Sequence, residues 1–274
     1  MRVAVTGAAS GIGAATCKIL KDRGDEVVAF DVMKPGKGVL KNIDRFFLLD
    51  ISDLASISEV LAKVDGKFDA LMNIAGVPPR SGKGGNNSGN EAQILAVNFF
   101  GLRKFTLSLL DKLSDGAAIV SVASRAGSKW RDNIAQVKSF LRLPEDTNLE
   151  EYCGRNGIDP VRSYDLSKEA IIVWSMAQTE AFLERGLRIN SISPAGVSTR
   201  ILEDFREAFG KERVDKNTER AGRACLPEEA ASAAVFMISK ESAWIKGCDI
   251  FVDGGSFAMA NGDLLELSEF ALVK

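Results

Sequence analysis

The 274-residue chain contains no histidine. Ser-His-Asp and Cys-His triads, HExxH zinc hydrolases and histidine pH switches each need an imidazole as base, ligand or titrating group, so the composition excludes all of them. Acid–base chemistry in this protein must therefore use Tyr, Lys, Ser, Asp or Glu side chains, or a bound cofactor.

The chain also lacks an excess of positive charge, because 35 Lys and Arg side chains stand against 37 Asp and Glu without a basic run. Nucleic-acid backbones are bound by clustered cations that release counterions, so we expect no nucleic-acid partner. No stretch approaches the ~18 consecutive apolar residues of a membrane-spanning helix, and the first residues do not resemble a secretion signal. We expect a cytoplasmic protein without a membrane partner.

Paired cysteines are missing as well. The four cysteines are scattered and form no CxxC spacing: Cys17, Cys153, Cys225 and Cys248. This spacing predicts neither a metal site nor a disulfide framework. Reduced thiols, buried in a cytosolic protein, are the simpler interpretation.

Short apolar segments alternate with amphipathic ones along the chain, which is typical of βαβ units. The segments that fit strands are 3–6, 26–31, 45–49, 70–74, 117–122, 187–193 and 250–252. The segments that fit helices are 12–23, 54–64, 91–110, 164–184 and 228–239. We predict an α/β fold in which residues 1–274 form a single domain. Its Rossmann-like, doubly wound parallel sheet has about seven strands, with helices on both faces.

Two segments interrupt this alternation. Residues 78–90 are rich in Gly, Asn and Ser, which predicts a solvated loop or an active-site flap. Residues 127–163 are too long for an idle loop and are helically patterned over 134–143, so we expect a lid-like insert. Its apolar side chains either pack on the domain or a subunit, or form a wall for an aromatic or steroid ring: Trp130, Phe140, Leu141 and Leu143.

A glycine-rich turn, TGAASGIG, follows the first predicted strand and leads into the first predicted helix. Such a turn lets the backbone approach a pyrophosphate, to which the helix N-terminus presents unpaired N–H groups. Asp31 ends the second strand, where a carboxylate accepts hydrogen bonds from ribose hydroxyls and repels a 2′-phosphate. No Arg lies in the turn or directly after Asp31, so the sequence favours NAD over NADP. A plain turn residue is the alternative for Asp31.

Tyr164 and Lys168 lie four residues apart in YDLSK and would share one face of a helix. A tyrosine whose pKa is near ~10 is a poor base at neutral pH, but an adjacent ammonium favours the phenolate and lowers that pKa. The pair could supply a base without histidine. Any amphipathic helix, however, can place Tyr and Lys at this spacing.

Together with further motifs in the same order, these segments resemble the short-chain dehydrogenase/reductase family over nearly the whole chain. TGAASGIG is similar to its cofactor turn, NIAG to its fourth-strand motif, and VNFFG, VASRAG and YDLSK to its active-site segments. The resemblance implies that the catalytic residues are Asn98, Ser124, Tyr164 and Lys168. It implies cofactor contacts by Gly7, Ser10, Gly11, Ile12, Gly13, Asp31, Asp50, Ile51, Asn73, Ala75, Gly76, Tyr164, Lys168, Pro194 and Thr199.

The resemblance also implies how these residues act. Tyr164 would exchange a proton with the substrate oxygen, while Ser124 hydrogen-bonds the same oxygen. Lys168 would lower the pKa of Tyr164 and bind the nicotinamide ribose, and Asn98 would anchor a water on the route to solvent. The hydride transfer belongs to the cofactor.

The wide gap between Ser124 and Tyr164 resembles one subgroup, that of coniferyl-alcohol dehydrogenases and bacterial 3α-hydroxysteroid dehydrogenase/carbonyl reductases. It implies an NAD-dependent enzyme that interconverts alcohol and carbonyl on a bulky apolar substrate, first a coniferyl-type aromatic alcohol and second a 3α-hydroxysteroid. An NAD-binding sensor or scaffold is the non-enzymatic alternative. A homodimer or homotetramer is implied. The chain departs from the family at Ala195, which separates the usual Pro-Gly pair and leaves the position of Thr199 open.

Overall fold

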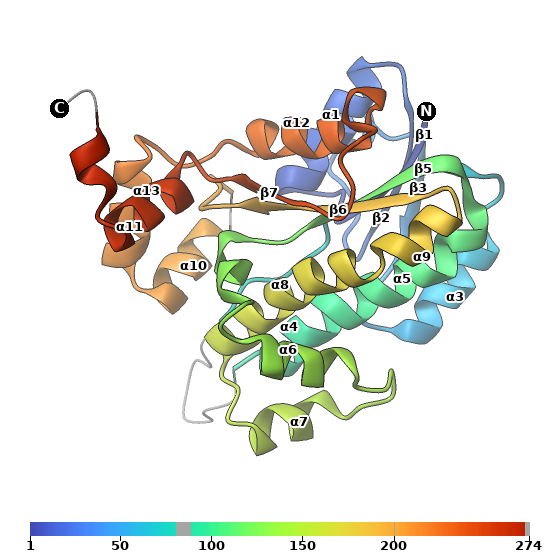
Figure 1. Ribbon diagram of the computed structural model, residues 1–274. Helices are drawn as coiled ribbons and strands as arrows, with labels where there is room; N and C mark the ends of the chain where they lie inside the picture. Colours follow the sequence, from blue (N-terminus) through green and yellow to red (C-terminus); the bar gives the residue numbers. More distant parts are fainter. Residues whose placement is uncertain (81–88, 200, 272–274) are drawn as a thin grey trace.

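The computed structural model describes residues 1–80, 89–199 and 201–271. Within them, parallel strands form one sheet in the order β3-β2-β1-β4-β5-β6-β7, which confirms the predicted Rossmann-like α/β fold (Figure 1). Each strand overlaps a predicted range: β1 (Arg2–Thr6), β2 (Glu26–Asp31), β3 (Arg45–Leu48), β4 (Phe68–Asn73), β5 (Leu113–Val122), β6 (Arg188–Pro194) and β7 (Asp249–Val252).

The strands are nearly continuous apolar runs because helices cover both faces of the sheet. Successive residues of a strand point to opposite faces, and in β1 they enter different apolar clusters. Ala4 belongs to the same cluster as Val28 and Phe30, whereas Val3 and Val5 belong to the cluster on the other face. The core therefore consists of two apolar layers that the sheet separates.

Helices on the two faces complete these layers (Figure 1). One face is covered by α1 (Gly11–Asp22) and α12 (Pro227–Ile238). The other face is covered by α3 (Leu54–Ala62), α5 (Leu102–Leu109) and α8 (Pro160–Ala177). The elements that the pattern did not predict are short or polar: α2 (Lys37–Leu40), α10 (Leu202–Phe209), α11 (Lys211–Arg220) and α13 (Ser256–Leu264).

The helix α8 begins before its predicted start at Tyr164. Asp159 caps it by accepting a hydrogen bond from the backbone N–H of Arg162, and Pro160 takes the first helical position, where its missing N–H costs nothing. The predicted continuation is a separate helix, α9 (Thr179–Glu184). These features give the Tyr164 turn a well-defined helical start.

The predicted helix 91–110 is interrupted by a π-helical turn. This turn, η1 (Ala96–Gly101), separates α4 (Glu91–Leu95) from α5 and carries the fully buried Asn98. Single π-helical turns inside α-helices frequently occur at functional sites.

The inserted segment 127–163 contains α6 (Ile134–Leu141) and α7 (Leu149–Arg155). These helices pack against α8 and α4, on the side of the helical layer that faces away from the sheet (Figure 1). Arg103 of α5 donates hydrogen bonds to backbone carbonyls at the end of α6. Most of the segment is thus attached to the outside of the domain.

Of the two alternatives for the apolar side chains of this segment, the structure shows packing on the helical layer. Phe140 is fully buried, and the centroid of its ring lies 5.2 Å from that of Phe99 and 5.6 Å from that of Phe100. Trp130 and two leucines of the segment pack against the same cluster. Apolar burial against the helical layer, rather than exposure to a ligand cavity, decides where these side chains lie.

Much of the predicted loop 78–90 lies outside the described residues, at 81–88. Its ends are tied together, because the backbone N–H of Arg80 donates to Oδ1 of Asn90 and the Asn90 amide donates to the carbonyl oxygen of Pro78.

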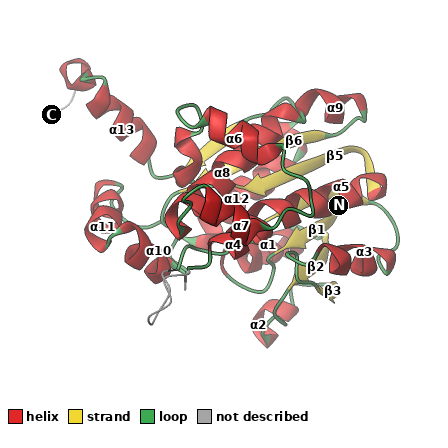
Figure 2. Ribbon diagram, turned by 90° about the horizontal axis from the view of Figure 1, so that it is seen from below, coloured by secondary structure: helices red, strands yellow, loops and turns green. Residues whose placement is uncertain are grey.

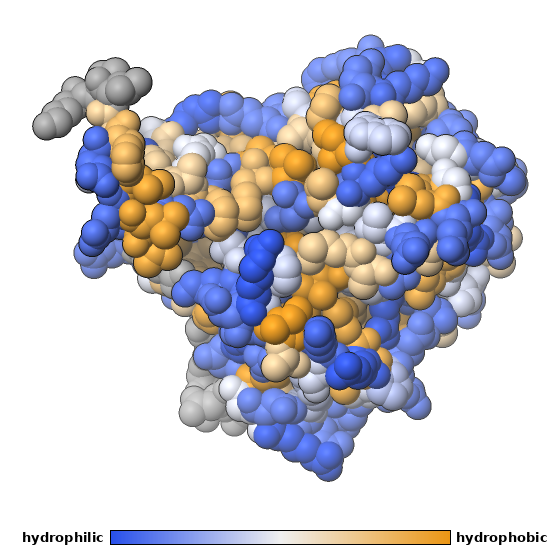
Figure 3. Space-filling model, in the orientation of Figure 1, coloured by the Kyte–Doolittle hydropathy of each residue, from blue (hydrophilic) through white to orange (hydrophobic). Residues whose placement is uncertain are grey.

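The C-terminal helix α13 and the turn η5 (Leu267–Phe270) extend away from the body of the domain (Figures 1 and 2). Apolar side chains gather on this extension at the surface (Figure 3), among them Leu264, Leu265 and Phe270. No helix in the described part of the chain is long and apolar enough to cross a membrane.

Replacing Phe140 by alanine will destabilise the protein, because it removes a buried ring and leaves a cavity. We expect a loss of about 3–5 kcal/mol in the free energy of unfolding, measured by urea denaturation. Lys138→Ala, at an exposed position of the same helix, is the control and will change stability little. A Phe140→Ala variant whose free energy of unfolding equals that of the wild type would contradict the buried position of this ring.

Candidate active site

The carboxyl ends of the central strands open into a cavity of about 1950 Å³. Single-ligand pockets usually measure ~300–1,000 Å³, so this cavity has room for a cofactor together with a substrate. Most of the predicted site residues line it: Gly7, Ser10, Gly11, Ile12, Gly13, Asp31, Asp50, Ile51, Ala75, Gly76, Ser124, Tyr164, Lys168, Pro194 and Thr199.

The glycine turn at the end of β1 leaves the start of α1 open to the cavity. A Cβ atom on Gly13 would lie 2.0 Å from the carbonyl oxygen of Gly7, so only glycine fits there. Ser10 is the N-cap, yet its side chain makes no capping hydrogen bond, and no acidic residue lies in the first turn. The turn therefore fits the pyrophosphate of a dinucleotide, with the N–H groups and partial positive charge of α1 directed at it.

Asp31 lies at the edge of the cavity and is 8% exposed. Its Oδ2 accepts a hydrogen bond from the backbone N–H of Ala9 at 2.9 Å, and its Oδ1 accepts one from that of Met33 at 2.8 Å. The carboxylate thus holds the turn and also lines the cavity. This arrangement agrees with both interpretations of Asp31, as a carboxylate available to ribose hydroxyls and as a residue that holds a turn.

Asn73 is the predicted cofactor contact that the structure does not bring to the cavity. Its side chain is buried and donates hydrogen bonds to the hydroxyl oxygens of Thr106 and Ser121, at 2.9 and 3.3 Å. It joins β4 to α5 and β5. Ala75 and Gly76, which follow it, line the cavity.

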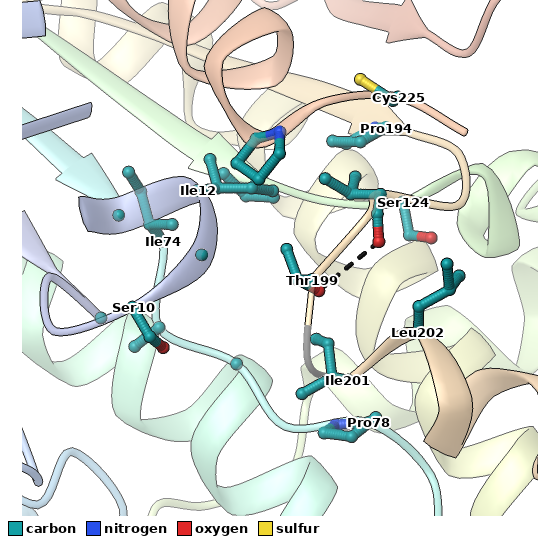
Figure 4. Close-up of a pocket in the computed structure, with 18 of the residues that line it drawn as sticks. Ser10, Ile12, Ile74, Pro78, Ser124, Pro194, Thr199, Ile201, Leu202 and Cys225 are labelled. Carbon is teal, nitrogen blue, oxygen red and sulfur yellow. Dashed lines mark hydrogen bonds between the residues drawn. The ribbon is translucent and has the colours of Figure 1, made fainter. Parts of the chain in front are cut away.

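With the extra alanine present, Thr199 lines the cavity and lies next to the glycine turn. The backbone N–H of Ala195 donates to the carbonyl oxygen of Val252, which continues the pairing of β6 with β7. The Thr199 methyl lies 3.3 Å from the place of a Cβ on Gly11, so this side chain reaches the glycine turn. Figure 4 shows Ser124, Pro194 and Thr199 around the same part of the cavity.

Ser124, which follows β5, and Tyr164, which lies on α8, both line the cavity, and the Ser124 side chain opposes the rise in the pKa of Tyr164. Lys168, one turn further along α8, is 5% exposed and donates a hydrogen bond to the carbonyl oxygen of Val122 at 2.9 Å. Its Nζ lies 5.6 Å from the centroid of the Tyr164 ring. The structure thus brings these three catalytic candidates together.

Asn98 is close to this group but does not line the cavity. Its Oδ1 accepts a hydrogen bond from the backbone N–H of Val77 at 2.8 Å, and its amide donates to the Val77 carbonyl and to Ser167. A Cβ on Gly76 would lie 3.3 Å from Oδ1 of Asn98 and 3.6 Å from Nζ of Lys168. Asn98 therefore fixes the backbone that borders Lys168.

Burial dominates the electrostatics of the pair. It raises the pKa of Tyr164, an effect that the Ser124 hydrogen bond opposes and the Asp165 charge increases. It lowers the pKa of Lys168 to about 7. The direction for Tyr164 is opposite to the expected one, because removal from water penalises the phenolate and also weakens the charge of Lys168. A phenolate at neutral pH requires additional positive charge beside Tyr164.

The side chains that cover Tyr164 belong to α10, a helix that the sequence pattern did not predict. The rings of Phe205 and Phe209 meet the Tyr164 ring edge-on, with centroids 5.1 and 6.1 Å away. Leu202 lines the cavity beside them (Figure 4). Positions 202, 205 and 209 share one helix face, and this spacing is the signal that could have identified the helix.

No cluster of three metal-ligating side chains occurs in the residues that the structure describes. The thiols of Cys17 and Cys153 are buried, whereas Cys225 lines the cavity and Cys248 is exposed. Burial raises the pKa of Cys17 to about 12, so this thiol stays protonated.

The lowered pKa of Lys168 has a consequence for stability. Between about pH 7 and the ordinary lysine pKa of 10.5, the unfolded chain binds a proton at Lys168 that the folded chain does not, so stability rises with pH in this window. Below pH 7 the buried Lys168 is protonated, so the free-energy cost of burying its ammonium is then fully present. We expect the stability of Lys168→Met, relative to wild type, to be highest below pH 7 and to fall as the pH rises.

Urea unfolding without added dinucleotide, repeated from about pH 6 to pH 10, measures this difference. The control is Lys138→Met, because Lys138 is exposed. A difference between Lys168→Met and wild type that stays constant with pH would contradict the lowered pKa.

Comparison with known proteins places this geometry in a family. Residues 1–136 match the family described as short chain dehydrogenase, and residues 147–256 match the one described as enoyl-(acyl carrier protein) reductase. The chain is 33% identical to coniferyl-alcohol dehydrogenase of a Pseudomonas species, over 93% of this chain and 95% of that protein. It is 28% identical to 3-alpha-hydroxysteroid dehydrogenase/carbonyl reductase of Comamonas testosteroni, over 92% and 95%.

A solved structure supports the same relationship. The 3-alpha-hydroxysteroid dehydrogenase of a Pseudomonas species, complexed with NADH, superposes with a TM-score of 0.75 and 26% identity, covering 96% of this chain and 99% of that one. The chain therefore belongs to the short-chain dehydrogenase/reductase family, whose members are NAD(P)-dependent oxidoreductases that act on alcohol and carbonyl groups.

Proposed function

We propose that the protein is an NAD-dependent dehydrogenase that interconverts an alcohol and a carbonyl on a bulky apolar substrate. A coniferyl-type aromatic alcohol is the first candidate and a 3α-hydroxysteroid the second. The observation that carries the proposal is that Ser124 and Tyr164 line one cavity, where the apolar face of α10 covers Tyr164. The relatives with these substrates in their names support the choice.

In this mechanism the substrate oxygen binds between the hydroxyls of Ser124 and Tyr164. Tyr164 removes the alcohol proton, or returns it to the carbonyl, and Ser124 holds the oxygen in place. A bound dinucleotide would supply the hydride acceptor and, when oxidised, positive charge, which would oppose the effect of burial on the pKa of Tyr164.

Lys168 and Asn98 support the proton transfer. Lys168 would bind the nicotinamide ribose, and its pKa of about 7 lets it accept or release a proton at neutral pH. Asn98 holds the backbone at Val77 beside Lys168, where a water would carry the proton to solvent. A sensor that binds NAD without turnover would have no use for these four residues together.

The preference for NAD rests on Asp31. Its carboxylate is held by two backbone N–H groups at the position where NADP would carry its 2′-phosphate, so a like charge would lie beside it. Lys34 also lines the cavity, but the negative charge of the Asp31 carboxylate stays at its fixed position.

We further propose that residues 1–274 form a single dinucleotide-binding catalytic domain, which acts in the cytoplasm as a homodimer or homotetramer. Exposed apolar side chains support an oligomer, among them Phe236 and Trp244.

Tyr164→Phe will reduce turnover at least about 100-fold, because the ring remains while the acid–base hydroxyl is lost. NADH formation is measured over a panel of aromatic, alicyclic and steroid alcohols. The control is Tyr152→Phe, since Tyr152 is the other tyrosine of the chain and its ring, on α7, packs against Phe140.

In the wild type, the acid limb of kcat/KM against pH will report the coupled Tyr164 and Lys168 groups.

Equal turnover by wild type and Tyr164→Phe, or an acid limb that Tyr164→Phe leaves unchanged, would overturn the mechanism. If the wild type binds NAD but turns over none of the panel, the sensor or scaffold becomes the better proposal.

Asp31→Asn will shift cofactor preference towards NADP by about tenfold or more, equivalent to ~1.4 kcal/mol, because it removes the negative charge at nearly constant size. Fluorescence titration with NADH and NADPH measures both dissociation constants. The control is Asp44→Asn, a carboxylate that pairs with Lys21 and does not line the cavity. An unchanged ratio of the two constants would show that Asp31 does not select the cofactor.

A further inference from the structure

Arg125 directly follows Ser124 but makes its contacts outside the catalytic group. Ser124 has extended backbone angles, and Arg125 extends towards the C-terminal part of the domain. Its Nε lies 3.2 Å from Oδ2 of Asp253, a carboxylate whose side chain is 6% exposed. Because β6 lies between β5 and β7 in the sheet, this ion pair crosses the carboxyl end of β6.

Aromatic rings lie beside the guanidinium of Arg125. Its central carbon lies 4.9 Å from the ring centroid of Phe257 and 5.7 Å from that of Phe251. The two rings are stacked on each other, with centroids 4.2 Å apart. A cation within about 6 Å of an aromatic ring is attracted to it, which favours arginine at this place.

Asp253 is itself held by the backbone. Its Oδ1 accepts a hydrogen bond from the N–H of Gly255 at 3.0 Å, and its Oδ2 accepts one from the N–H of Phe257 at 2.7 Å. The hydroxyl of Ser256 donates to the same carboxylate at 3.0 Å. The partner of Arg125 is therefore a fixed point, formed where β7 meets α13.

The other side of the Ser124 turn is also fixed. A Cβ on Gly127 would lie 2.9 Å from the carbonyl carbon of Lys168, so the turn lies directly against α8. The backbone N–H of Ala126 donates to the hydroxyl oxygen of Ser124 at 3.2 Å. The turn is held against α8 at Gly127 and against Asp253 at Arg125, with Ser124 next to the second contact.

We propose that Arg125 is a positioning residue, whose ion pair with Asp253 sets the distance of the Ser124 hydroxyl from Tyr164. This inference rests on the proposed role of Ser124. A displacement of about 1 Å in a reacting group can lower a rate by about 100-fold, so a small shift of the turn is sufficient to impair turnover. Both partners line the cavity, so the dissociation constant for NADH is measured beside kcat to separate an effect on turnover from one on dinucleotide binding.

The test is a double-mutant cycle on kcat with Arg125→Gln, Ser124→Ala and the double variant. We expect Arg125→Gln to lower kcat at least about tenfold without changing the dissociation constant for NADH. If Arg125 acts through Ser124, the double variant will be about as active as Ser124→Ala alone. Asp253→Asn will resemble Arg125→Gln, and Arg125→Lys will recover part of the lost turnover because it keeps the charge.

The matched control is Arg220→Gln, which removes the ion pair between α11 and Asp263 of α13 without touching the Ser124 turn. It will leave kcat within about twofold of wild type. Additive losses in the cycle, or a fall in melting temperature with unchanged kcat for Arg125→Gln, would overturn the proposal. Full activity of Ser124→Ala would instead show that the proposed role of Ser124 is wrong.

Discussion

The candidate site forms because all strands of the sheet run in the same direction, so their carboxyl ends share one edge. The strand order reverses between β1 and β4, and the connections leave this edge in opposite directions, which opens a crevice. The glycine turn follows β1, Gly76 follows β4 and Ser124 follows β5. The cofactor cradle and the proton-transfer groups are therefore neighbours in space, although they are separated along the chain.

Burial controls the chemistry at this edge. Tyr164 and Lys168 are both removed from water, which disfavours the charged form of each and moves their pKa values in opposite directions. In the proposed mechanism, positive charge from a bound dinucleotide would favour the phenolate of Tyr164. The proposed mechanism thus has acid–base chemistry in a chain without histidine, because the Lys168 pKa of about 7 lies where an imidazole would titrate.

The two unusual segments of the fold have different relations to the site. The insertion 127–163 stabilises the outer helical layer through Phe140, and only Ser128 and Lys129 at its beginning line the cavity. The helix α10 instead covers Tyr164 with an apolar face, and Arg80 pairs with Asp204 of this helix. The apolar surface next to the reacting groups therefore comes from the chain after β6, not from the insertion.

Local pattern made several features predictable. Short apolar runs predicted the strands, the glycines predicted the turn after the first strand with Asp31 beyond it, and the spacing of four residues predicted the Tyr164–Lys168 pair. Family resemblance added Asn98 and Ser124 as candidates. The inward turn of Asn73, the packing of Phe140 and the cover by Phe205 were decided only by the tertiary structure. Each depends on contacts between residues far apart in the chain, and the direction of the Tyr164 pKa follows from that burial rather than from any neighbour in the sequence.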